Sequence, residues 1–198
     1  MPIIFKIIIL ILIILGIAIC VYFWQRSNQQ KIGGKEGLNQ QSPLSESNAT
    51  NMKIESPAFG NNEPLPAKYT CDGEEINPPL QIGDVPEGAK SLVLIVDDPD
   101  APGGTWVHWT VWNIDPRTTE IAENSVPESA VEGITSFGRP GYGSPCPPSG
   151  DHRYFFKLYA LDIILELAPS TTIRELEAAM QGHIIREAQV VGLYKRQR

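Results

Sequence analysis

The sequence has fewer positively charged than negatively charged residues. Its 198 residues include 16 Lys and Arg against 23 Asp and Glu, which gives a formal net charge of −7. No cluster of Lys and Arg with interleaved aromatic residues occurs in the chain. Without such a basic patch there is no general electrostatic attraction to a phosphate backbone, so we expect no nucleic-acid partner.

Signatures of catalysis and of metal binding are also missing. The chain has only three His residues, and no His-x-x-x-His pair is present to hold a metal ion. No Gly-x-Ser-x-Gly element occurs, which removes the nucleophile elbow of the α/β-hydrolases. We therefore predict no metal and no cofactor.

One long apolar segment stands at the amino terminus. Between Ile3 and Trp24 nearly every residue is apolar, with Lys6 the only charge, and roughly twenty such residues suffice to cross a bilayer. Residues 1–24 are therefore predicted to form one transmembrane helix that anchors the protein. A signal peptide cleaved near Ala18 is the alternative. The apolar run continues past that point, which favours the uncleaved anchor.

Charge counting does not decide on which side of the membrane the rest of the chain lies. Lys6 precedes the apolar segment, and Arg26, Lys31 and Lys35, partly offset by Glu36, follow it. These charges lean slightly toward a cytoplasmic domain. A short leader with one Lys ahead of an apolar core is nevertheless how export signals usually begin. We therefore expect a membrane-anchored protein with an extracytoplasmic globular domain.

A polar segment separates the predicted anchor from the rest of the chain. Residues 25–51 are rich in Gln, Asn, Ser and Gly, with almost no apolar residues that could offset the entropy of ordering. They are predicted to form a flexible tether. Residues 52–198 are enough for one domain with its own core, and no internal repeat is visible in them.

Three short runs predict that this domain is mainly β. Each is apolar and β-branched or alternates with a period of two. In the second run, strict alternation places His108 on the face opposite Trp109. The runs are 91–97, 105–114 and 153–161, and a final short strand is expected at 189–194.

One helix is predicted before the final strand. Thr171 or Thr172 can cap it, and Glu175 falls in its first turn. Five residues at helical spacing form its apolar stripe. They are Ile173, Leu176, Met180, Ile184 and Ala188. Two stretches crowded with Gly and Pro, 57–88 and 133–151, are predicted to be loops.

Three short motifs contain the polar side chains that are candidates for a functional site. They are Asp98-Pro-Asp-Ala-Pro102, Trp106-Val-His-Trp109 and Pro145-Cys-Pro-Pro-Ser-Gly-Asp-His-Arg-Tyr154. Prolines in the first motif hold the Asp98 carboxylate in one place, and pairing of neighbouring strands would bring His108 within its reach. The third motif delivers His152 and Tyr154 to one face of a strand. Together the motifs predict a compact polar pocket.

This set of motifs resembles the phosphatidylethanolamine-binding protein (PEBP) family. The likeness extends over residues 52–198, and four further elements look like its prokaryotic branch, which is often called Raf kinase inhibitor-like or YbhB/YbcL-type. These elements are Tyr69-Thr-Cys-Asp-Gly73, Asn77-Pro-Pro79, Gly141-Tyr-Gly143 and Val190-Val-Gly-Leu-Tyr194. The resemblance implies a PEBP-like antiparallel β-sheet fold with a C-terminal helix, preceded here by the one transmembrane helix.

Carried over position by position, the resemblance implies a small anion pocket. Its ligand-binding residues would be Asp98, His108, Cys146, Pro147, His152 and Tyr154, with the Cys146-Pro147 turn as its lip. Asp100 and Arg153 look like the pair that braces the first and third motifs. Cys146 stands where eukaryotic members have glycine, and the loop before His152 is shorter than theirs. A bare phosphate, sulfate or acetate-sized anion therefore fits the resemblance better than a full phospholipid headgroup.

A carboxylate beside an anion requires a compensating charge. Protonated His108 or His152 could supply it, and the Tyr154 hydroxyl could donate a hydrogen bond. Asp98 would then either orient a His or receive the ammonium group of a zwitterion such as phosphoethanolamine. The same residues could form a two-His, one-carboxylate metal site, but without a close ligand pair we predict none.

Cys71 and Cys146 lie in loops that the family places near the pocket. An exported domain would allow them to form a disulfide. Otherwise they are two inert buried thiols. Two cysteines supply no spacing pattern that decides between these states.

We therefore predict a binding module, not an enzyme. Its ligand would be a phosphate-bearing small molecule or a phospholipid headgroup, and it would regulate or inhibit a protein partner at the membrane. One alternative is a hydrolase with His108 or His152 as general base and Cys146 or Ser149 as nucleophile. Another is inhibition of a protease or kinase through an exposed loop, a role that some relatives have.

Overall fold

The structure, a computed structural model, describes residues 51–196. The predicted transmembrane segment, 1–24, and nearly all of the predicted tether, 25–51, lie outside the described residues, so both stay predictions. Within the described part, no helix is both long enough and apolar enough to cross a membrane.

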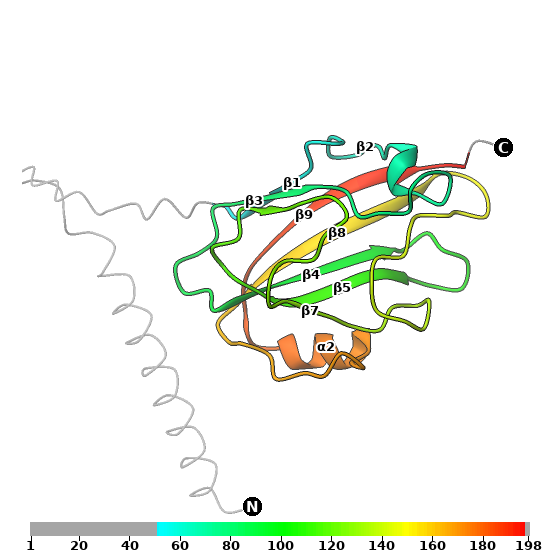
Figure 1. Ribbon diagram of the computed structural model, residues 1–198. Coiled ribbons are helices and arrows are strands. Elements are labelled where there is room, and N and C mark those ends of the chain that lie inside the picture. The colour runs from blue at the N-terminus through cyan, green and yellow to red at the C-terminus, as the bar shows by residue number, and fades with distance from the viewer. Residues whose placement is uncertain (1–50, 197–198) are drawn as a thin grey trace, which may run out of the picture. The chain divides into compact units, whose positions relative to one another are not determined.

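A six-stranded sheet runs through the domain (Figure 1). Its strand order is β2-β9-β8-β4-β5-β7, and every pairing is antiparallel except the short one between β2 and β9. The strands are β2 (Glu63–Pro64), β9 (Ile184–Tyr194), β8 (His152–Leu161), β4 (Ser91–Asp98), β5 (Trp106–Ile114) and β7 (Val131–Glu132). The three predicted central strands begin and end within one residue of β4, β5 and β8, and the mainly β prediction is confirmed.

Both faces of β4 are covered, and this explains its apolar sequence. Every residue from Ser91 to Asp98 is buried, as expected for a strand in the interior of a packed sheet. Strand β8 alternates instead: His152, Tyr154 and Phe156 are buried, and the residues between them are more exposed. Two of the predicted site residues therefore lie on the inward face of β8.

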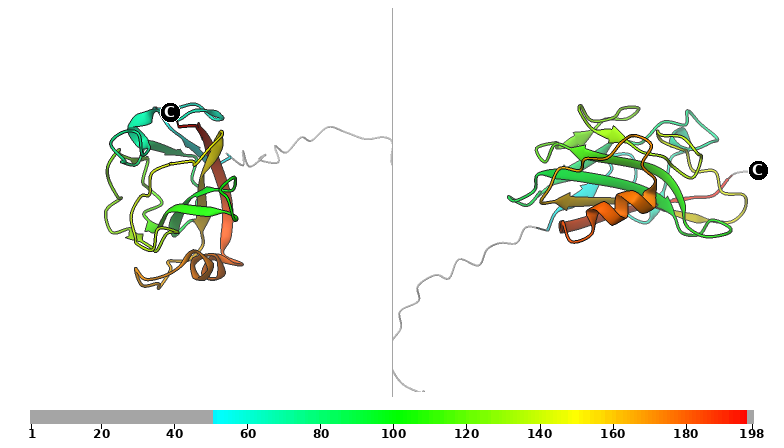
Figure 2. Two further views of the ribbon diagram at one scale, coloured as in Figure 1. Left: turned by 90° about the vertical axis from the view of Figure 1, so that its right-hand side faces the viewer. Right: turned by 90° about the horizontal axis from the view of Figure 1, so that it is seen from below.

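A smaller sheet, with strand order β1-β3-β6, packs on one face of the large sheet and encloses the main core with it (Figure 2). Its strands are β1 (Lys53–Glu55), β3 (Leu80–Gly83) and β6 (Glu120–Ile121), and the 3-10 helix η1 (Ala67–Tyr69) precedes β3. The prediction that 57–88 is entirely loop is therefore wrong, because β2, η1 and β3 lie in it. Elements of two to four residues are too short to show a period.

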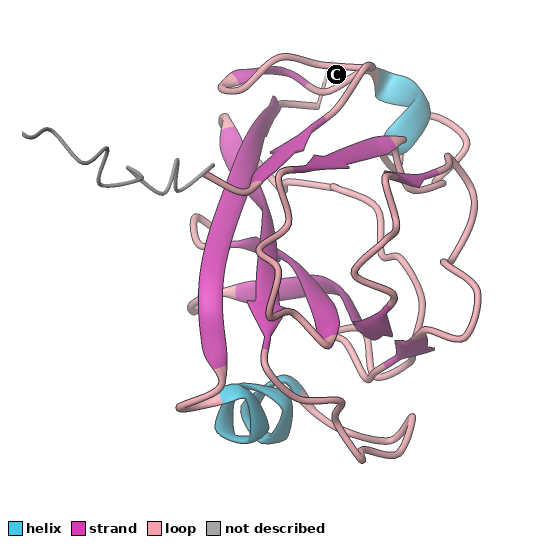
Figure 3. Cartoon of the chain, turned by 90° about the vertical axis from the view of Figure 1, so that its left-hand side faces the viewer, coloured by secondary structure: helices cyan, strands magenta, loops and turns pink. Residues whose placement is uncertain are grey.

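One α-helix, α2 (Ile173–Met180), packs on the opposite face of the large sheet (Figure 3). Its buried residues, Leu176 and Met180, contact a second core cluster on that face. Thr172 caps it, and Glu175 reciprocates by accepting the backbone N–H of Thr172 at 2.8 Å. This capping box satisfies two backbone donors that the first turn would otherwise leave free.

The predicted helix extends too far. Its apolar stripe was expected to reach Ala188, but the helix ends at Met180 and β9 already begins at Ile184. Gly182 lies between them with φ of +83°, a left-handed conformation that terminates helices. The residues after it are extended because they pair with β8 along its length. The final strand is therefore longer than the predicted 189–194.

Candidate functional site

Asp98 and His152 meet at one end of the large sheet. Asp98 is the last residue of β4 and His152 the first of β8, and the two strands are antiparallel neighbours. Nδ1 of His152 donates to Oδ2 of Asp98 at 2.7 Å, and the backbone N–H of Asp100 donates to Oδ1 at 2.8 Å. Both side chains are buried. The carboxylate therefore orients the His152 ring, which is one of the two roles expected for it.

His108 reaches the same cluster through a β-bulge. The register of β4 against β5 shifts between Val96 and Asp97, and His108 is the extra residue. Its ring packs edge-on against Tyr154, with centroids 5.2 Å apart. Tyr154 belongs to the core cluster that contains Trp109. The predicted strict alternation, which placed His108 and Trp109 on opposite faces, is therefore wrong here.

The backbone of Gly143 determines which ring nitrogen of His108 carries a proton. Nδ1 lies 2.7 Å from the carbonyl oxygen of Gly143, and the N–H of Gly143 donates to the His108 carbonyl at 2.8 Å. A carbonyl oxygen only accepts, so Nδ1 is the protonated nitrogen and Nε2 remains for a ligand. Burial lowers the pKa of His108, against smaller raising effects from the Gly143 bond and from Asp98 and Asp97.

The hydroxyl of Tyr154 has unusual surroundings. The residue is fully buried, yet its hydroxyl has no hydrogen-bond partner among residues 51–196. Burial raises its pKa, so it keeps its proton and can donate. Leaving such a group unpaired costs about 1–3 kcal/mol. A ligand oxygen that accepts from it would remove that cost.

Asp100 and Arg153 form the brace that the resemblance implies. Nε and Nη2 of Arg153 donate to the two carboxylate oxygens at 2.8 and 2.7 Å, and the backbone N–H of Arg153 donates at 3.0 Å. The guanidinium bonds lower the pKa of Asp100 to about 2. Because this pair joins the 98–102 turn to the start of β8, it helps to hold Asp98 and His152 together.

Cys71 and Cys146 are joined by a disulfide, with their Cα atoms 5.4 Å apart. The backbone N–H of Cys71 also donates to the carbonyl of Pro145 at 3.1 Å, and the hydroxyl of Tyr142 donates to the carbonyl of Tyr69 at 3.1 Å. These links attach η1 and the loop after it to residues 142–146. Cys146 itself is exposed, and Pro147, the other lip residue, is buried.

Sequence reasoning missed an aromatic residue beside the site. The ring of Phe137 lies 5.5 Å from that of His108 and 5.4 Å from that of Trp106. A Cβ at Gly143 would overlap the Phe137 ring, so a larger residue there would displace that ring from its present contact with His108. The Gly141-Tyr-Gly143 element pointed to this segment without giving its role. No pattern around Phe137 indicates its contact.

The two-His, one-carboxylate set considered above consists of Asp98, His108 and His152. No group of three His, Cys, Asp or Glu side chains within residues 51–196 is arranged to hold a metal ion. Asp98 and His152 bond to each other through Oδ2 and Nδ1.

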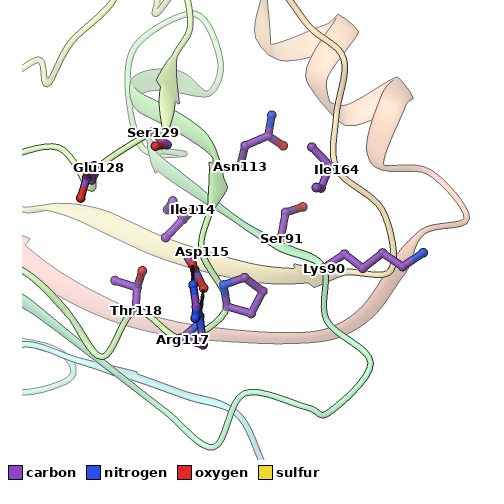
Figure 4. A pocket seen from close by; sticks show the side chains of 11 residues that line it. Lys90, Ser91, Asn113, Ile114, Asp115, Arg117, Thr118, Glu128, Ser129 and Ile164 are labelled. Carbon is purple, nitrogen blue, oxygen red and sulfur yellow. Dashed lines mark hydrogen bonds and ion pairs between the residues drawn. The ribbon is translucent and has the colours of Figure 1, made fainter.

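A cavity of about 730 Å³ lies at the other end of the sheet, where β4 starts and β5 ends (Figure 4). Several of its polar groups already have partners. Arg117 pairs with Asp115 at 2.6 Å, and the Asn113 amide exchanges two hydrogen bonds with the backbone of Leu165. None of the predicted site residues lines it.

Known proteins resemble this chain over the whole domain. The model of the phosphatidylethanolamine-binding protein family matches residues 55–195. The UPF0098 protein of Methanothermobacter thermautotrophicus is 48% identical in an alignment 150 residues long, and the match covers 73% of this chain and 99% of that protein. A PEBP homologue of Chlamydia trachomatis has a solved structure with a TM-score of 0.72 at 45% identity, covering 74% of this chain and 99% of its own.

Escherichia coli YbcL is a second solved structure of this kind, and it is described as a new member of the mammalian PEBP family. It has a TM-score of 0.70 at 30% identity and covers 74% of this chain and 99% of its own. The matched residues run from β1 to the end of β9 and include the three polar motifs. The chain therefore belongs to the phosphatidylethanolamine-binding protein family, in its prokaryotic YbhB/YbcL-type branch.

Proposed function

We propose that the domain binds a small phosphate-bearing anion, which includes the headgroup of a phospholipid, and does not transform it. The observation that carries this proposal is the fully buried Tyr154 hydroxyl, which has no partner among the described residues. The ring of His108 packs against Tyr154 and keeps Nε2 as its remaining polar atom. An anion oxygen can accept a hydrogen bond from the Tyr154 hydroxyl, and it can accept a second one from Nε2 once the His108 ring is protonated.

Asp98 supports this proposal through the partners that it already has. One carboxylate oxygen accepts from His152 and the other from the backbone of Asp100. These donors offset the negative charge that would otherwise repel an anion. Phosphoethanolamine, the headgroup that the family name implies, is then bound mainly through its phosphate.

The Cys71–Cys146 disulfide favours binding over hydrolysis and an extracytoplasmic location over a cytoplasmic one. In its oxidised state Cys146 has no thiol to act as a nucleophile, and Ser149 lies in an exposed turn. This favours binding over the hydrolase alternative. A stable disulfide is also typical of an oxidising compartment, which supports an extracytoplasmic domain on a membrane anchor. Regulation of a protein partner would follow from ligand occupancy of this site.

The test uses residues 51–198 alone. The C. trachomatis relative is covered to 99% by this domain, so the domain folds there as a whole protein. Phosphate and phosphoethanolamine at millimolar concentration should raise the melting temperature, and Asp98→Ala or His152→Ala should abolish the increase. His183→Ala is the matched control, because His183 bonds to Asp162 on the surface. No increase with either ligand would exclude the proposed site.

A further inference from the structure

One covalent bond joins two segments that border the proposed site. The first segment, residues 69–75, we call the η1 loop, and the second, residues 142–147, we call the lip segment. Cys71 lies in the η1 loop and Cys146 in the lip segment, and a disulfide connects them. No other cysteine occurs in residues 51–198, so any effect of a reductant on the domain must come from this bond.

The η1 loop is a fixed platform. Within it, the backbone N–H and the hydroxyl of Thr70 both donate to the carbonyl of Ala67, at 3.0 and 2.8 Å. Asp72 accepts from the hydroxyl of Tyr194 at 2.6 Å, and Tyr194 lies opposite His152 in the β8–β9 pairing. The loop is therefore attached to the sheet beside one histidine of the site, independently of the disulfide.

The lip segment is attached to the other histidine. Gly143 exchanges two hydrogen bonds with His108, one through the ring and one through the backbone. Pro147 at its other end is buried, but Cys146 between them is exposed. The position of this segment therefore bears directly on the His108 ring and on the predicted lip of the pocket.

Hydrogen bonds alone hold the lip segment to the η1 loop weakly. Apart from the disulfide, three such bonds join the two segments within the described part of the chain. They are Cys71 N–H to the Pro145 carbonyl at 3.1 Å, Tyr142 hydroxyl to the Tyr69 carbonyl at 3.1 Å, and Ser144 hydroxyl to Glu75 at 3.2 Å. Glu75 is exposed, so water competes for the last bond.

We propose that the Cys71–Cys146 disulfide is a redox switch for the anion site: the oxidised domain binds the anion tightly and the reduced domain binds it weakly. This inference rests on the proposed function, because it concerns the regulation of that same site. Once the bond is open, the lip segment gains conformational freedom that ligand binding must remove. Fixing the backbone of one residue is worth about a tenfold change in affinity, and we expect a loss of that size.

The reductant for this switch is a dithiol. Cys146 is the more exposed partner and Cys71 is half-buried, so one thiolate of the dithiol attacks Sγ of Cys146 and displaces the Cys71 thiolate. The second thiolate of the dithiol then attacks its own sulfur in the mixed disulfide and releases the Cys146 thiolate. The dithiol loses two electrons and becomes a disulfide, and its two protons end on the two cysteine sulfurs.

Calorimetric titration of phosphate into residues 51–198 tests the switch. The domain is titrated once oxidised and once in excess dithiothreitol, and the reduced form should bind about tenfold more weakly. Cys71→Ser/Cys146→Ser should bind like the reduced domain and should not respond to dithiothreitol. Sucrose in all samples favours the compact state, and melting curves recorded in parallel show that each form is folded.

A second variant keeps both cysteines. Tyr142→Phe removes one of the three hydrogen bonds between the segments. In the oxidised domain the disulfide still holds the lip segment, so phosphate affinity should stay the same, whereas in the reduced domain it should fall further, by about threefold. Tyr159→Phe is the matched control, because Tyr159 packs against the core cluster on the α2 side of the sheet and should affect neither state.

The outcomes separate this inference from the proposed function. Equal phosphate affinity in the oxidised and reduced domains, both folded, would overturn the switch and leave the function intact, and so would tighter binding after reduction. Absence of binding in both states would remove the function and the switch with it. Linkage gives an independent check, since phosphate should make the disulfide harder to reduce by the same factor. A thiol–disulfide equilibrium that phosphate does not change would also overturn the switch.

Discussion

Asp98 and His152 form a buried pair, 2.7 Å apart, with 4% and 8% of their side chains exposed. The pair joins the end of β4 to the start of β8. The same bond therefore links the two strands and fixes the orientation of the His152 ring. A carboxylate that fixes the tautomer and orientation of a His is a common supporting arrangement in binding sites.

Replacing Asp98 by Asn tests this supporting role. The side chain keeps its size but loses its charge, so the charge-assisted bond to His152 weakens. Calorimetry should give a phosphate affinity lower by about tenfold. Asp115→Asn, which removes a surface carboxylate paired with Arg117 at the other end of the sheet, should leave the affinity unchanged. Equal affinities for the two variants would contradict the role assigned to Asp98.

Tyr154→Phe should change stability and affinity in opposite directions. The variant removes a buried hydroxyl without a partner, so the free energy of unfolding should stay the same or rise by up to about 1–3 kcal/mol. Phosphate binding should be lost. Tyr142→Phe is the contrasting control, since its hydroxyl donates to Tyr69 and its loss should destabilise by about 1 kcal/mol. Denaturant unfolding of the ligand-free domain would refute the idea if Tyr154→Phe were clearly less stable.

Much of the site could be predicted because its residues stand next to strong local signals. Asp98 follows a buried apolar strand and precedes fixed prolines, and His152 begins an alternating run. Antiparallel pairing of β4 and β8 then brings these ends together. The Asp100–Arg153 brace came from the family resemblance, and the bidentate geometry agrees with it.

The parts that could not be predicted depend on tertiary contacts. The bulge at His108 arises from a register shift between two strands, and strict alternation within one strand cannot show it. Ile184 fits a helical stripe by spacing, but Gly182 ends the helix and pairing with β8 decides the conformation that follows. Phe137 reaches the site from a loop whose path no periodic pattern records.

Removal of the disulfide should destabilise the domain strongly. Cys71 and Cys146 are 75 residues apart in sequence, and a bridge across a segment of that length lowers the entropy of the unfolded chain by an amount worth about 4 kcal/mol. Urea unfolding of residues 51–198 with and without a reductant should show this difference. The Cys71→Ser/Cys146→Ser double variant should match the reduced protein and should not respond to reductant. Identical midpoints in all samples would speak against a structural bridge.

Protonation of His108 should lower the stability of the free domain. Burial depresses its pKa in the folded state, whereas the unfolded chain has the ordinary value of about 6.5. Below that value the unfolded state binds more protons than the folded state, so the free energy of unfolding falls as the pH falls through this window. The measurement compares the pH dependence of unfolding for the domain with that of His108→Gln, which should lack this contribution.

Anion affinity should change with pH in the opposite sense. An anion near Nε2 favours the protonated ring, so binding raises the pKa of His108 and draws in a proton. Affinity should therefore increase as the pH is lowered from about 8 to about 5. Sulfate is the suitable probe, because its own charge is constant over this range and any slope belongs to the protein. His108→Gln should bind more weakly and lose most of the slope, and a sulfate affinity that is flat with pH in the unmodified domain would place the anion away from His108.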